Sequence, residues 1–231
     1  MRHSIFTAFA LFAITVAFIV TPASARAFMI DLENQHNLSN IGTIYGNEYP
    51  NGITGKTGVQ SWTVAGAFPE MSLQIPSWGF CIEMPQAVVN GWFAVLSLDE
   101  VPHSSDGLPM GSTKANYIRE LWGRDFDSAW ITGADAQMAE AFSAAIFEII
   151  YETDSSWDIT SGTGFYCTGL EESATNTANT RLSQLNGNKA YFANNLYAVR
   201  GYGQDYVVQT PEPATLLLLG IGGLFLGKRK K

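Results

Sequence analysis

Cys81 and Cys167 are the two cysteines of this chain, and their thiols are its most reactive side chains. A thiolate forms disulfides or attacks acyl carbons, whereas a buried thiol behaves as a small apolar group. Two cysteines in an oxidising compartment most often pair with each other. The sequence therefore leaves two interpretations of Cys81: a disulfide with Cys167, or a buried residue of a strand.

Two segments resemble the signature segments of thioester domains, which are surface adhesin modules of bacteria. The first is Phe-Cys-Ile-Glu at residues 80–83, and the second is residues 141–152. In that family a Cys thiolate attacks the side-chain amide of a Gln and expels ammonia. The buried thioester that results can capture an amine of a partner. The resemblance implies that Cys81 supplies the sulfur and that Glu83 is the family's glutamate.

The Gln of that family stands two residues before an Ala-Ile-aromatic triplet, which residues 145–147 supply here. The matching position is Ser143, whose hydroxyl offers no acyl carbon to a thiolate. Gln137 precedes it by nearly two helical turns, or about 9 Å along the axis. We therefore expect no working thioester at the matching positions, and we expect Glu83 to be a structural carboxylate.

Residues 1–27 have the three parts of a secretory signal peptide. A positive start precedes an apolar run at residues 5–20, and two overlapping Ala-x-Ala sites follow. We expect signal peptidase to cleave after Ala25 or Ala27, once the export machinery has carried the chain to the membrane.

The end of the chain resembles the PEP-CTERM sorting signal of Gram-negative bacteria. Pro-Glu-Pro is followed by an apolar run at residues 214–226 and by a basic terminus. A helix over this run would span about 20 Å, against a hydrocarbon core of about 30 Å. We expect a short transmembrane helix that holds the chain transiently. The residues of the signal are Pro211, Glu212, Pro213, Lys228, Arg229, Lys230 and Lys231.

The sorting signal implies an address and a partner. Its basic end should stay in the cytoplasm, so the domain should lie outside the inner membrane. The resemblance implies processing by exosortase, a membrane peptidase, followed by a place at the cell surface or outside the cell. Whether the protein is released or re-attached stays open.

Residues 28–210, between the two signals, form the exported domain. This stretch has 7 Lys and Arg against 20 Asp and Glu, a formal charge of −13. Nucleic acid is therefore excluded as a partner, because phosphate binding needs clustered cations. His36 and His103 are its histidines, and they show no metal-ligand spacing with the two cysteines. We expect no metal, no cofactor and no enzymatic activity.

The hydrophobic pattern of this domain predicts an α+β fold. Strands are expected at residues 59–64, 78–84, 91–98, 157–160, 164–167 and 205–208, and helices at 114–123, 134–152 and within 171–199. Strands first, helices in the middle and a closing strand indicate a single domain with a mainly antiparallel sheet or barrel and a helical insertion.

These observations favour an exported, exosortase-sorted surface or matrix protein that acts in adhesion or matrix assembly without a working thioester. One alternative is a covalent thioester adhesin that uses Cys81 with a Gln not yet located. Another is a secreted carbohydrate-binding or carbohydrate-active protein, with extracellular polysaccharide as a possible partner. Tryptophans can form a platform for sugars, although most of the six should belong to the core. They are Trp62, Trp78, Trp92, Trp122, Trp130 and Trp157.

Overall fold

The computed structural model describes residues 28–37, 41–46, 49–56, 58–68, 74–83, 86–101, 108–153 and 156–211. The expected signal peptide at 1–27 and the expected membrane helix at 214–226 lie outside these residues. Within the described part of the chain, no helix has both the length and the apolar character needed to cross a membrane.

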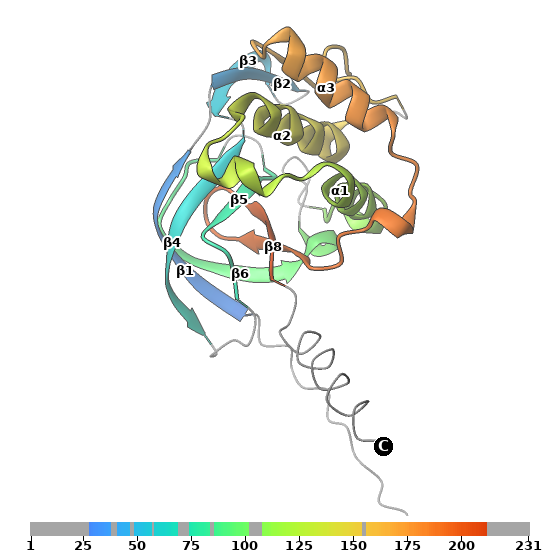
Figure 1. The fold of residues 1–231 in the computed structure, drawn as a ribbon. Coiled ribbons are helices and arrows are strands. Elements are labelled where there is room, and N and C mark those ends of the chain that lie inside the picture. Colours follow the sequence, from blue (N-terminus) through green and yellow to red (C-terminus); the bar gives the residue numbers. More distant parts are fainter. Residues whose placement is uncertain are drawn as a thin grey trace, which may run out of the picture.

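Six antiparallel strands close a barrel in the order β1-β4-β5-β9-β8-β6 (Figure 1). Closure leaves no unpaired edge on this sheet, so the predicted antiparallel sheet or barrel is confirmed as a barrel. The strands are β1 (Phe28–Asn37), β4 (Val59–Phe68), β5 (Trp78–Cys81), β6 (Gly91–Ser97), β8 (Leu196–Arg200) and β9 (Tyr206–Gln209).

A second, three-stranded sheet has the order β3-β2-β7. Its strands are β2 (Ile41–Gly46), β3 (Tyr49–Lys56) and β7 (Phe165–Thr168). The pairing of β2 with β7 joins the first part of the domain to the segment between its second and third helices. The Tyr45 and Tyr166 rings stack across this pair, with centroids 4.6 Å apart.

Three α-helices lie in the chain between β6 and β8, which confirms the predicted helical insertion. They are α1 (Gly111–Asp125), α2 (Ala136–Tyr151) and α3 (Glu172–Ser183). Helix α2 is buried along nearly its whole length, as expected for a helix with apolar residues on every side. It lies between the barrel and α3 (Figure 1).

An aromatic cluster joins the barrel to the helices. Phe80 of β5 packs against Phe142 of α2 and Trp122 of α1, with centroid distances of 5.1 and 5.6 Å. Half of the six tryptophans lie in this cluster, and the Trp62 side chain is also buried, so most of the tryptophans belong to the core. The members of the cluster are Trp78, Phe80, Trp122, Phe126, Trp130 and Phe142.

Two sequence predictions of local structure are wrong. Residues 157–160 form a turn rather than a strand. The helical region predicted within 171–199 ends at Ser183, and β8 occupies Leu196–Arg200. Leu196 and Ala198 point to one face of β8 and are buried, so closure of the barrel overrides the weak helical pattern of this segment.

Candidate functional site

The two segments that resemble thioester-domain signatures lie side by side. Phe80 and Phe142, one from each segment, pack together in the aromatic cluster. The residues that follow them are Cys81 and Ser143, with exposed fractions of 4% and 0%. The Ser143 hydroxyl has no hydrogen-bond partner within the part of the chain that the structure describes. The structure therefore keeps both residues away from solvent.

Cys81 faces the interior of the barrel. It pairs with Tyr206 of β9, and directly opposite residues of an antiparallel pair share a face. The Tyr206 ring meets Trp62 of β4 and Phe93 of β6, with centroids 4.8 and 6.2 Å away. Neither β4 nor β6 is a neighbour of β9, so these rings meet across the interior. Burial raises the pKa of the Cys81 thiol far above its usual range, which keeps it protonated at neutral pH.

Gln60 of β4 is a candidate that the sequence pattern did not single out. It is 1% exposed, and among the described residues neither polar atom of its side-chain amide has a hydrogen-bond partner. Gln60 pairs with Gly79 of β5, two residues from Cys81 on the same face. Such diagonal neighbours are within reach of long side chains. Alternation along β4 places Gln60 on the face of Trp62, and this is the signal that could have found it.

Glu83 lies just past the end of β5 and is 8% exposed. It accepts a hydrogen bond from Gln86 Nε2 at 2.7 Å through Oε1, which agrees with a structural carboxylate. Asp205, which is 1% exposed, is the second acid at this end of the barrel. Burial, and then the charge of Glu83, raises the pKa of Asp205 to about 7. The Gly201 N–H and Arg200 oppose this rise. Nothing in the sequence pattern pointed to Asp205.

Cys167 lies in β7 of the smaller sheet, whereas Cys81 lies in the barrel. Both are buried free thiols in this structure, which gives no support to the expected disulfide. Burial, with the charge of Glu148, raises the pKa of the Cys167 thiol to about 12.

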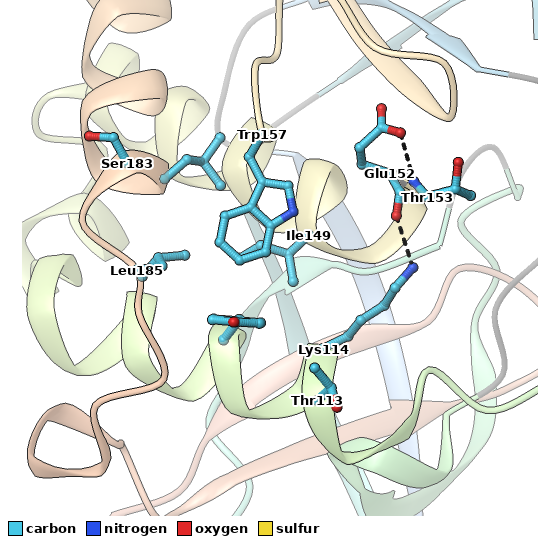
Figure 2. A pocket seen from close by; sticks show the side chains of 10 residues that line it. Thr113, Lys114, Ile149, Glu152, Thr153, Trp157, Ser183 and Leu185 are labelled. Atoms are coloured by element: carbon cyan, nitrogen blue, oxygen red, sulfur yellow. Dashed lines mark hydrogen bonds between the residues drawn. The ribbon is translucent and has the colours of Figure 1, made fainter. Parts of the chain in front are cut away.

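An open pocket of about 470 Å³ lies where α1 meets the ends of α2 and α3 (Figure 2). Its aromatic part is formed by Tyr117 of α1 and Trp157, whose rings meet edge to face with centroids 4.6 Å apart. Its aliphatic part is formed by Ile149, Leu182 and Leu185. The pocket therefore offers a mixed apolar surface to a small ligand, and its volume is within the range of small-molecule sites.

Hydroxyl groups and one ion of each sign complete the lining of the pocket. The hydroxyls belong to Thr113, Thr153 and Ser183. The Lys114 ammonium donates hydrogen bonds to the backbone carbonyls of Ile150 and Glu152. The Glu152 carboxylate accepts from the backbone N–H of Thr153 at 2.7 Å and of Gly164. Both charges are thus held by the protein's own groups.

The segment that carries Trp157 is tied to two helices. The Asp158 N–H donates to Glu148 Oε1 of α2 at 2.8 Å. The Asp158 carboxylate accepts from the Thr160 hydroxyl at 2.7 Å and from Asn179 Nδ2 of α3 at 2.8 Å. These bonds, that of Thr160 first, lower the pKa of Asp158. Trp157 of the pocket therefore stands beside an anchored turn, whereas Tyr117 is held by helix α1.

Hydrogen bonds hold the chain in place as far as Thr210, next to the last residue that the structure describes. The Thr210 N–H donates to the Asn195 carbonyl at 3.0 Å, and Asn195 Nδ2 donates back to the Thr210 carbonyl. Gln209 Nε2 donates to Asn195 Oδ1 at 3.2 Å and its Oε1 accepts from Trp122 Nε1 of α1 at 2.8 Å. Thr210 is 2% exposed, whereas Pro211 is exposed. Among the described residues, Thr210 is the last to make one of these bonds, and it directly precedes Pro-Glu-Pro.

These elements define an α+β protein in which a closed barrel carries a helical layer with an open, mixed pocket. Comparison with known proteins adds one assignment: residues 209–231 match the PEP-CTERM protein-sorting motif. The motif supports an exported protein that exosortase recognises and sorts at the membrane. No curated protein and no solved structure matches the chain. Among the described residues, no group of three or more His, Cys, Asp or Glu side chains could hold a metal ion.

Proposed function

We propose that this protein is a non-enzymatic exported protein that acts in adhesion or extracellular-matrix assembly by binding through its folded surface. The observation that carries the proposal is the position of the sorting motif, which begins at Gln209, the last residue of the closing strand β9. The part of the protein that the motif would sort is thus the barrel with its helical layer. Its formal charge of −13 suits a domain that stays soluble beside an anionic membrane surface.

A deletion strain with complementation tests this proposal. The wild-type chain should restore attachment and a normal matrix, and the protein should be recovered from the surface or matrix fraction. A chain with Pro211, Glu212 and Pro213 all changed to Ala should be expressed but should restore neither. Normal attachment and matrix in the deletion strain would contradict the proposal. So would a hydrolase activity that disappears in Glu83→Gln or Asp205→Asn.

A covalent adhesin is the second candidate, and the unpartnered amide of Gln60 favours it. In this reaction the Cys81 sulfur would bond to Gln60 Cδ, the Cδ–Nε2 bond would break, and ammonia would leave with the thiol proton. Gln60 would thereby replace the absent Gln at the Ser143 position. The reaction would also remove a buried amide that lacks hydrogen bonds.

Intact mass spectrometry of the exported protein separates the states of Cys81. A thioester lowers the mass by one ammonia, and Gln60→Ala and Cys81→Ala should each abolish that loss. A disulfide with Cys167 lowers the mass by two hydrogens. An unchanged mass means two free thiols and rules out the covalent candidate, while the binding function is unaffected.

A further inference from the structure

We propose that the pocket between α1, α2 and α3 binds a neutral saccharide. This inference rests on the proposed function, for which it names the ligand class and the site. The pocket is open to solvent and is built from three parts of the chain that are far apart in sequence. Figure 2 shows the Trp157 indole in the middle of the lining side chains.

The arrangement of apolar and polar groups fits a sugar ring. A pyranose presents an apolar C–H face and a rim of hydroxyls, so it requires an aromatic or aliphatic surface with hydrogen-bonding groups around it. Trp157 and Tyr117 provide the aromatic surface. The Thr113 and Thr153 hydroxyls, which also line the pocket, can both donate and accept hydrogen bonds.

The charges of the pocket favour a neutral ligand. The Lys114 ammonium is bonded to the carbonyls of Ile150 and Glu152, so an anionic ligand would compete with groups that already hold it. The Glu152 carboxylate is bonded in the same way to backbone N–H groups. The acidic balance of the domain, −13 between residues 28 and 210, further disfavours polyanions.

The test measures binding of the exported, processed protein to neutral oligosaccharides of glucose, galactose and N-acetylglucosamine by titration calorimetry. Oligosaccharides of uronic acids and a proline-rich peptide serve as comparison ligands. Trp157→Leu keeps an apolar side chain but removes the aromatic face, and Trp92→Leu is the matched control because Trp92 is 48% exposed on β6 of the barrel. Thr113→Trp, at an exposed position of α1, fills the pocket without changing the turn at Trp157.

We expect at least one neutral oligosaccharide to bind, and we expect Trp157→Leu or Thr113→Trp to weaken it about tenfold or more while Trp92→Leu does not. Thermal unfolding of each variant shows whether it is folded. If Trp157→Leu is not folded, the binding of Thr113→Trp decides the test. Absence of neutral saccharide binding overturns the inference, as does binding that both pocket variants retain or a preference for the uronic acids or the peptide. If no neutral saccharide binds but the deletion strain has an attachment defect, the proposed function still stands. If a neutral saccharide binds but the deletion strain attaches normally, only the proposed function is contradicted.

Discussion

The barrel interior and the helical pocket satisfy their polar groups in different ways. Inside the barrel, the Gln60 amide is buried, and none of the described residues forms a hydrogen bond with it. At the pocket, the Lys114 ammonium is hydrogen-bonded to backbone carbonyls, and the buried Glu152 carboxylate is hydrogen-bonded to backbone N–H groups. Buried polar groups without hydrogen-bond partners destabilise a protein, whereas hydrogen-bonded polar groups hold the residues around the pocket in place. The unpartnered amide in the barrel interior therefore lowers the free energy of unfolding, whereas the hydrogen-bonded groups of the pocket hold its shape without such a loss.

The largest effect is expected where the two regions meet, at Phe80. Phe80→Ala removes a fully buried ring that touches both α1 and α2. We expect a loss of about 3–5 kcal/mol in the free energy of unfolding, measured by denaturant titration. Tyr202→Ala, at a fully exposed residue, is the control. A loss at Phe80 no larger than that of the control would show that the cluster does not couple the barrel to the helices.

Asp205 should make the barrel less stable as the pH rises. Its pKa is raised from 3.8 to about 7 in the folded protein, so between these values the folded state binds more protons than the unfolded state. The free energy of unfolding should fall from about pH 4 to pH 7, by at most about 4 kcal/mol. Denaturant titrations across this range measure the slope. Asp205→Asn should flatten it, and an equal slope in the variant would contradict the prediction.

Gln60→Met should stabilise the protein. Methionine is similar in shape and needs no hydrogen bond, so we expect a gain of about 1–3 kcal/mol in the free energy of unfolding. Thermal and denaturant unfolding measure the gain. The control is Gln74→Met, at an exposed position, which should change the free energy of unfolding little. A loss of stability at Gln60 would mean that its amide has favourable interactions, and the contrast between the two regions would fail.

The smallest effect on stability is expected in the pocket. Thr113→Ala removes one exposed hydroxyl and should change the free energy of unfolding by less than about 0.5 kcal/mol. The same change should weaken saccharide binding measurably in the calorimetric assay. A variant with unchanged stability and unchanged binding would show that this hydroxyl does not face the ligand.

Much of the fold could be predicted from the sequence, because strong periodicity marks its main elements. The pattern of α2 and the apolar run of β6 predicted those elements closely. The strands β2 and β3 were not predicted, because residues 34–56 are rich in Asn, Gly and Thr. The strand β1 was not predicted either, and its pairing with β4 comes from tertiary contacts. β8 was missed because its role depends on closing a barrel with strands distant in sequence.

The candidate sites were less predictable than the fold. The resemblance to thioester domains implied that the segments of Cys81 and Ser143 lie close together, and the adjacent residues Phe80 and Phe142 do pack together. Gln60 could have been found from strand alternation. The pocket could not, because Tyr117, Trp157 and Leu185 come together only when three helices pack, and no local pattern encodes that meeting.

The bonded end of the domain also sets a geometry for the protein after sorting. Asn195 holds Thr210, and Gln209 is bonded to Trp122 of α1. Lys114, in the pocket, stands two turns earlier on the same helix, about 12 Å along its axis. Helix α1 thus acts as a rigid spacer between the point where the chain leaves the domain and the pocket. The pocket therefore lies at a fixed offset from Thr210, the residue that directly precedes Pro-Glu-Pro, because α1 connects the two.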